Sequence, residues 1–159
     1  SIGIEIQNQG HEHGYENFSL KQINSVRKLL KKLSKLYKIN KNNILGHSDI
    51  APERKKDPGE KFPWKELAKF KLVKWHSLNE KKIEKTRCLE LNEIEKKQFL
   101  KNLYKIGYVQ IKVHNKSLNN KILVSAFQRR YRQNLINGKI DKECFLISKN
   151  LLKRSNNNC

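Results

Sequence analysis

The spacing of apolar residues changes from a strand-like to a helical pattern near the start of the chain. Isoleucine occupies every second position from Ile2 to Ile6, which is the pattern of a strand with one apolar face. Apolar residues then recur every three or four positions and predict a helix over 19–38. Ser19 and Gln22 have the spacing of a capping box, so we expect the helix to begin there.

The second half of the chain predicts three short helices. The first apolar run at helical spacing begins near Leu91 and ends at Gly107, a residue type that often terminates helices. The second run precedes Gly138 and the third follows it. We therefore expect a small three-helix bundle over 91–153, preceded by a charged linker over 77–90 that has few apolar residues.

Composition limits the size and the partners of the molecule. With 159 residues, of which 36% are hydrophobic, the chain has room for one ordinary domain or two small ones. The 35 Lys and Arg against 15 Asp and Glu give a net charge of +20, which favours nucleic acid, an anionic membrane surface or an acidic wall polymer as partner. Many lysines stand beside Asn or Ile, a bias that AT-rich coding also produces, so charge alone does not choose among these partners.

Two further features of the composition bear on the class of protein. No apolar run reaches the roughly 18 residues that a membrane-spanning helix needs. Cys88, Cys144 and Cys159 are far apart and form no CxxC pair, which indicates neither a disulfide framework nor a zinc ribbon. The chain lacks Met, and a strand opens it abruptly, so we expect the sequence to be a piece of a longer chain.

The loop from Gly46 to Gly59 has the residues most suited to chemistry. It contains an imidazole, His47, and a carboxylate, Asp57, separated by a segment with Pro52 that can fold both onto one metal ion. Catalytic zinc takes three protein ligands from His, Asp, Glu or Cys and keeps one open position. From spacing alone, a solvent-facing histidine and a turn aspartate remain the commoner explanation.

Four segments together resemble a known enzyme family. They are SIGIE at 1–5, GHSDIAP at 46–52, RKKDPG at 54–59 and FPW at 62–64. In this order they are similar to the C-terminal part of the zinc-dependent N-acetylmuramoyl-L-alanine amidases of the AmpD and AmiD type. The resemblance covers residues 1–76 and implies an α/β fold, with a mixed sheet flanked by helices in this partial amidase domain.

The resemblance also implies roles for individual residues. His47 and Asp57 match two zinc ligands of the family, and its other histidine ligand is expected upstream of Ser1. Glu5 matches the catalytic glutamate, which takes a proton from the attacking water. Lys55 matches the lysine that stabilises the oxyanion of the tetrahedral intermediate.

Residues near these positions receive weaker assignments. We expect His11, His13 and Tyr15, in a loop bounded by glycines, to bind substrate at the rim of a cleft. Asp49 is expected to form a hydrogen bond within its own turn rather than bind metal. Trp64 is expected in the core.

The second half resembles the peptidoglycan-binding type-1 module, a three-helix domain. The matching segments are FLxxLxxxGY at 99–108, AFQRRY at 126–131 and GxID at 138–141. Without that resemblance, the basic segment Gln128–Arg132 could contact phosphates or form a solvated helix face.

The resemblances imply an enzyme that uses Zn²⁺ to hydrolyse the amide between N-acetylmuramic acid and L-alanine in peptidoglycan or muropeptides, in the periplasm or cell envelope of a bacterium. This chain, as a truncated piece, could be inactive. A non-catalytic peptidoglycan-binding protein is the alternative, and a basic nucleic-acid-binding protein is a weaker one. We expect no nucleic-acid partner and no transmembrane segment, and the oligomeric state stays open.

Overall fold

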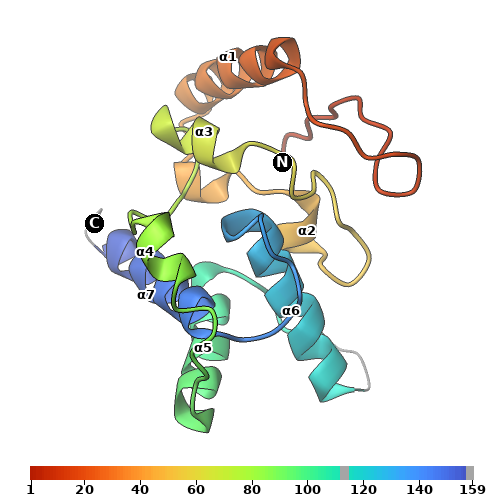
Figure 1. Ribbon diagram of the computed structural model, residues 1–159. Coiled ribbons are helices and arrows are strands. Elements are labelled where there is room, and N and C mark those ends of the chain that lie inside the picture. The colour runs from red at the N-terminus through yellow and green to blue at the C-terminus, as the bar shows by residue number, and fades with distance from the viewer. Residues whose placement is uncertain (112–114, 157–159) are drawn as a thin grey trace.

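The computed structural model describes residues 1–111 and 115–156, apart from the side chains of residues 116 and 154–156, and its regular elements are helices (Figure 1). In chain order they are α1 (Leu20–Leu36), the 3-10 turn η1 (Lys41–Asn43), α2 (His47–Ile50), α3 (Trp64–Lys69), α4 (Glu80–Glu84), α5 (Glu93–Ile106), α6 (Lys116–Tyr131) and α7 (Lys142–Asn156).

The predicted mixed sheet is wrong. Within residues 1–111 and 115–156 no segment is a strand, and the isoleucine-rich start of the chain runs irregularly along the surface (Figure 1). Ile2 is 50% and Ile4 36% exposed, whereas Ile6 packs against the nearby core. A strand persists only where a second strand accepts and donates its backbone hydrogen bonds, and alternating side chains cannot supply that partner.

Helix α1 begins as its capping residues predict. The Ser19 hydroxyl accepts a hydrogen bond from the Gln22 amide at 3.2 Å, and the Gln22 side chain accepts one from the Ser19 amide at 2.8 Å. Val26 and Leu30 are buried, but Leu29 and Leu36 are exposed. The buried stripe of α1 is therefore narrower than the apolar pattern predicts.

A small apolar core holds the first part of the chain together. Phe18 contacts Phe62 edge-on, with ring centroids 5.3 Å apart, and Phe62 contacts Trp64 at 4.6 Å. Trp64 is buried, which confirms its predicted core position. The buried members of this core are Val26, Leu30, Phe62, Trp64, Leu67 and Val73.

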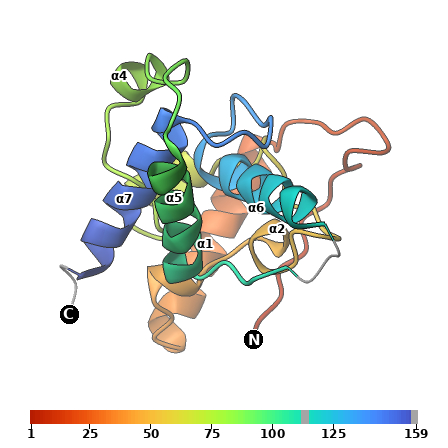
Figure 2. The ribbon, with the colours of Figure 1, turned by 90° about the horizontal axis from the view of Figure 1, so that it is seen from below.

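A larger core lies among α5, α6 and α7, the three helices predicted for 91–153. Helix α5 lies beside α7 (Figure 2) and ends at Gly107, whose positive φ of 122° suits a residue without a side chain. Phe99 and Phe127 meet edge-on at 5.4 Å in its centre. The buried members are Ile83, Leu91, Phe99, Leu103, Tyr108, Ile111, Leu123, Val124, Ala126, Phe127, Tyr131, Cys144, Phe145, Ile147 and Leu151.

The segment predicted as a linker is itself structured. Residues 77–90 contain α4, whose Ile83 is buried in the larger core, and Arg87 forms an ion pair with Glu143 of α7 at 2.5 Å. Trp75 packs against both cores. The division into units at 1–76, 77–90 and 91–153 stays a prediction.

Candidate functional site

The loop between Gly46 and Gly59 is folded by backbone and side-chain hydrogen bonds within the loop. Asp49 accepts a hydrogen bond from the Gly46 amide at 2.8 Å, which confirms the predicted turn contact and fixes the start of α2. The Ser48 amide donates to the Asp57 carbonyl oxygen at 2.9 Å. This bond brings the two ends of the loop together, so that His47 and Asp57 become neighbours although ten positions separate them.

The close approach of the two ends of the loop leaves no room for a side chain at Gly46. A Cβ atom at this position would lie 2.7 Å from Cδ of Pro58 and 3.2 Å from the Trp64 ring. A larger residue would therefore push the two ends of the loop apart.

The side chains of His47 and Asp57 point at one another. Nδ1 of His47 lies 2.8 Å from Oδ2 of Asp57, and the two side chains are 56% and 58% exposed. The structure thus brings together the two residues predicted to bind metal, on a surface that solvent and ligands can reach.

The donor chemistry of this pair suits zinc, although two side chains supply only part of a site. Ligands about 2.1 Å from a tetrahedral zinc lie ~3.4 Å apart, so the pair would open by about half an ångström to hold the ion. Exposed side chains can move that far at little cost. Across the described part of the chain, no three His, Cys, Asp or Glu side chains form a group that could hold a metal.

The two residues predicted to be catalytic lie in different settings. Lys55 belongs to the same loop, where its side chain is partly buried and its amide donates to the carbonyl oxygen of Ala51 at 3.0 Å. Glu5 lies on the exposed N-terminal segment, and no hydrogen bond or ion pair of the described residues joins it to His47 or Asp57. Their predicted roles stay predictions.

Two of the three predicted substrate-binding residues lie next to Pro58 and Gly59, which follow Asp57 in the chain. The Tyr15 hydroxyl donates to the carbonyl oxygen of Pro58 at 2.7 Å and accepts from the Lys61 amide at 2.9 Å. His11 stacks on Tyr15 at 4.4 Å. Burial raises the pKa of Tyr15 to about 12, so the phenol remains a hydrogen-bond donor at neutral pH. His13 is exposed, and the structure does not bring it to this group.

A cavity of about 300 Å³ lies next to this loop and is shared with the second half of the chain. His11, Lys56 and Glu60 line it from one side, and Arg129 and Gln133 from the other. Glu60 lies 3.1 Å from Nε2 of His11 and 3.7 Å from Nε of Arg129. The predicted rim residue His11 therefore lines a cavity that contains charged groups of both signs.

The structure contains a buried polar cluster at α2 that the sequence did not predict. Oδ1 of Asp49 accepts a hydrogen bond from the Tyr108 hydroxyl at 2.8 Å, and Oδ2 lies 3.4 Å from Nη1 of Arg130. Arg130 is only 2% exposed, donates to the Ile44 carbonyl oxygen at 3.1 Å and lies over the Trp64 ring at 3.3 Å. We call Asp49, Tyr108 and Arg130 the buried cluster.

The buried cluster changes the interpretation of the basic segment on α6. Arg130 pairs with Asp49, and Arg132 pairs with Asp141 and with Glu143. Both arginines are buried, so neither forms the exposed basic face that contact with phosphates requires. The sequence gives little sign of this pairing, because Arg130 and Asp49 are 81 positions apart.

Comparisons with known proteins show what this chain is similar to. Residues 1–60 match the family model described as N-acetylmuramoyl-L-alanine amidase. The chain is 30% identical over 159 residues to N-acetylmuramoyl-L-alanine amidase AmiD of Escherichia coli (strain K12), an alignment that covers 97% of this chain and 57% of the relative.

Two solved structures are similar in fold. The complex of AmiD from E. coli with the substrate anhydro-N-acetylmuramic acid-L-Ala-D-gamma-Glu-L-Lys matches with a TM-score of 0.74 and 28% identity, over 89% of this chain and 55% of the other. AmpDh3 from Pseudomonas aeruginosa in complex with anhydromuramic pentapeptide matches with a TM-score of 0.74 and 26% identity, over 89% and 56%.

The chain spans little more than half the length of these relatives. The family match ends at residue 60, whereas the likeness to AmiD continues through the helices that follow. The loop that joins His47 to Asp57 thus lies in the part of the chain that matches the N-acetylmuramoyl-L-alanine amidase family.

Proposed function

We propose that this chain forms part of a zinc-dependent N-acetylmuramoyl-L-alanine amidase. The reaction is hydrolysis of the amide between N-acetylmuramic acid and L-alanine in peptidoglycan or muropeptides. The observation that carries the proposal is the 2.8 Å approach of His47 to Asp57, in a loop that lies within the matched residues.

Each site residue has a separate task in this proposal. His47 and Asp57 hold zinc, together with a further histidine from a preceding part of the parent chain. Zinc there supplies Lewis-acid chemistry, which polarises a carbonyl group and acidifies water. Glu5 accepts the proton of the attacking water, and Lys55 offers a fixed positive charge to the oxyanion that develops on the substrate.

The cavity beside the loop supports a muropeptide as substrate. A stem peptide carries both carboxylates and amide groups, and Lys56, Arg129 and Gln133 present complementary groups around the cavity. His11 lines the cavity and stacks on Tyr15, and we propose that both bind substrate, with His13 as a further predicted contact. The AmiD and AmpDh3 structures hold anhydromuramyl peptides, which favours that substrate class.

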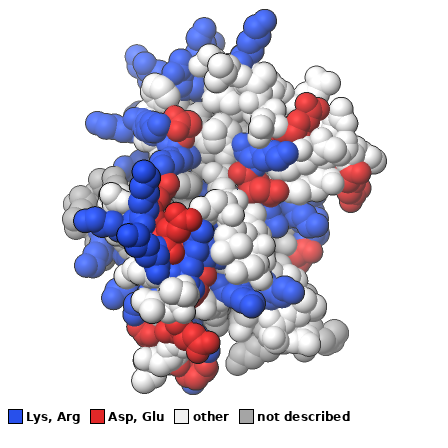
Figure 3. Space-filling model, viewed as in Figure 1, with Lys and Arg blue, Asp and Glu red and all other residues white. Residues whose placement is uncertain are grey.

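We further propose that residues 91–153 act as a peptidoglycan-binding module and that the protein works in the bacterial cell envelope. The net charge of +20 suits an anionic wall polymer. Basic side chains cover much of the face in Figure 3, with acidic side chains among them. No helix of the described residues is long and apolar enough to cross a membrane.

The proposed reaction is tested in the parent protein that contains this chain. Hydrolysis of an anhydromuramyl tripeptide is followed by chromatography for the variants His47→Ala, Asp57→Ala and Glu5→Ala. Each variant is expected to lose turnover by about 100-fold or more, because each lacks a ligand or a proton acceptor. Retained turnover in all three would refute the assignment.

A non-catalytic peptidoglycan-binding protein remains a second candidate, favoured by one observation. The described residues hold two side chains at the site and no group of three metal ligands. Binding to purified peptidoglycan without added zinc, combined with no hydrolysis by the parent protein under zinc saturation, would support this candidate over the enzyme.

A further inference from the structure

Arg130 of α6 contacts the chain on both sides of His47. Its Nη2 donates to the carbonyl oxygen of Ile44 at 3.1 Å, which lies before the histidine in the chain. Its Nη1 lies 3.4 Å from Oδ2 of Asp49, which lies after it. One guanidinium group therefore joins the two segments that flank a proposed metal ligand.

The Asp49 carboxylate connects Arg130 to the residue directly before His47. Oδ2, the oxygen that faces the guanidinium, also accepts a hydrogen bond from the Gly46 amide at 2.8 Å. Oδ1 accepts one from the Tyr108 hydroxyl at 2.8 Å. Because both oxygens are engaged, the carboxylate cannot turn away without losing a buried hydrogen bond, and the backbone at His47 is held in place.

The same turn sets the position of the second proposed metal ligand, Asp57. The Ser48 amide donates to the Asp57 carbonyl oxygen at 2.9 Å, and the Ala51 amide donates to the His47 carbonyl oxygen at 2.8 Å. The approach of the two ligand side chains therefore depends on the backbone that the buried cluster holds. Ligands that are held in position before binding bind more tightly, because less ordering is required when the ion arrives.

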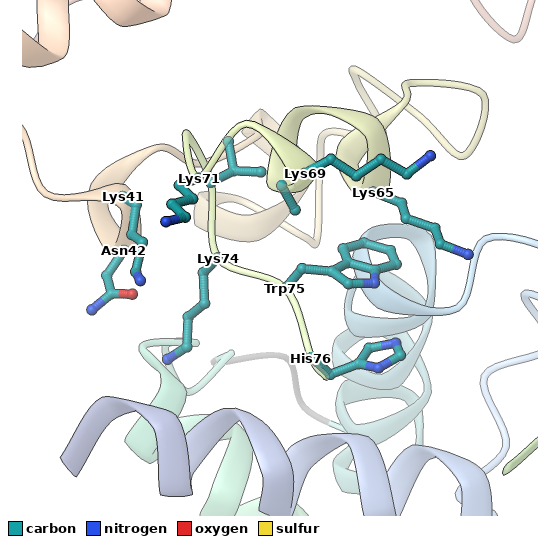
Figure 4. Close-up of a pocket in the computed structure, with 10 residues that line it drawn as sticks. Lys41, Asn42, Lys65, Lys69, Lys71, Lys74, Trp75 and His76 are labelled. Atoms are coloured by element: carbon teal, nitrogen blue, oxygen red, sulfur yellow. The ribbon is translucent and has the colours of Figure 1, made fainter. Parts of the chain in front are cut away.

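Packing leaves Arg130 little freedom to move. The residue is 2% exposed, and its guanidinium lies over the Trp64 ring at 3.3 Å. The next residue, Tyr131, contacts Phe127 at 5.2 Å and Trp75 at 5.7 Å. Trp75 packs against both cores and lines the lysine-rich cavity drawn in Figure 4. The end of α6 that carries Arg130 is thus fixed by both cores.

We propose that Arg130 is a positioning residue of the metal site, which acts through Asp49, and that α6 is for this reason a structural part of that site. The proposal rests on the proposed zinc-binding role of His47 and Asp57. It gives the second half of the chain a task besides the proposed binding of peptidoglycan. Arginine suits this task, because its planar guanidinium donates to two acceptors in fixed directions, whereas the ammonium group of lysine acts as a point charge.

The variants Arg130→Lys and Arg132→Lys, made in the parent protein that contains this chain, form a matched pair. Both residues are buried near the end of α6 and both pair with carboxylates. The partners of Arg132 are Asp141 and Glu143, which belong to the helical part and not to the loop from Gly46 to Gly59. Lysine keeps the positive charge, so the pair of variants measures the loss of the guanidinium contacts rather than of charge.

Hydrogen exchange of the Ser48 amide, followed by NMR in the zinc-free protein, measures how often the two ends of the loop separate. Arg130→Lys is expected to speed up this exchange by about tenfold, and Arg132→Lys by less than about twofold. A general loss of stability would instead speed up the exchange equally in both variants.

Zinc affinity, measured by competition with a chelating dye, tests the consequence for the metal. Arg130→Lys is expected to weaken zinc binding by about tenfold, as is usual for residues that orient metal ligands, and Arg132→Lys by less than about twofold. Tyr108→Phe removes one of the contacts of Asp49 and should weaken zinc binding by about threefold.

Equal Ser48 exchange in Arg130→Lys and Arg132→Lys, or equal zinc affinity in the two, would overturn the positioning role and leave the proposed amidase function intact. An unchanged parent protein that binds no zinc would refute the proposed function itself, and with it the positioning of a metal ligand. The two failures are therefore told apart by the zinc affinity of the unchanged protein.

Discussion

Two groups of side chains on one short turn have opposite surroundings. His47 begins α2 and meets Asp57 on the surface, with both side chains more than half exposed. Asp49, two positions later, points inward to Tyr108 and Arg130, where all three residues are buried. The two sides of the turn therefore differ in what they can do. The buried side chain of Asp49 anchors the turn to the helical part of the chain, whereas the exposed side chains of His47 and Asp57 are accessible to a ligand.

The largest expected effect is that of Arg130→Ala. This change leaves the Asp49 carboxylate buried without its cationic partner, so the free energy of unfolding should fall by about 3–5 kcal/mol. Urea denaturation followed by circular dichroism measures it. Arg54→Ala serves as the control, because Arg54 pairs with Glu53 on the surface at 3.7 Å and should change the free energy by less than about 1 kcal/mol. Equal losses in the two variants would mean that the buried cluster does not anchor the turn.

A smaller effect is expected for Tyr108→Phe. The change removes the 2.8 Å hydrogen bond to Asp49 but keeps the ring in the core, so the free energy of unfolding should fall by about 1–3 kcal/mol. Tyr104→Phe is the matched control: it removes the same hydroxyl group four positions earlier in the chain, from a tyrosine that is exposed. A Tyr108→Phe protein as stable as the control would show that Asp49 needs no partner besides Arg130.

The smallest expected effect concerns the reactivity of two cysteines in the helical part of the chain, one buried and one exposed. Burial raises the pKa of the Cys144 thiol to about 12, whereas Cys88 is exposed. Because the thiolate is the reactive form, iodoacetamide at neutral pH should modify Cys88 and spare Cys144 until the protein is denatured. Mass spectrometry of the peptides measures this, and early labelling of Cys144 would indicate that the core opens readily.

Local signals in the sequence predicted local features well. The Ser19–Gln22 capping box, the end of α5 at Gly107 and the hydrogen bond of Asp49 within its turn depend on residues a few positions apart, and all three are confirmed. The approach of His47 to Asp57 is also local, since one proline-containing loop joins them.

Long-range features were beyond the reach of these signals. The alternation over Ile2–Ile6 predicted a strand, but a sheet needs partners from other segments, and the described residues supply none. The basic segment on α6 suggested a surface, yet Arg130 finds its carboxylate 81 positions away. Pairing at such distance is decided by the packing of helices, which spacing along the chain does not encode.

Zinc titration of this chain, followed by isothermal calorimetry, tests most directly whether His47 and Asp57 hold one metal ion. We expect His47→Ala and Asp57→Ala each to weaken zinc binding by about tenfold or more while the free energy of unfolding stays within about 0.5 kcal/mol, because both side chains are exposed. His13→Ala, also exposed, should bind zinc as the unchanged chain does. Zinc affinity that is the same in all four proteins would contradict the assignment.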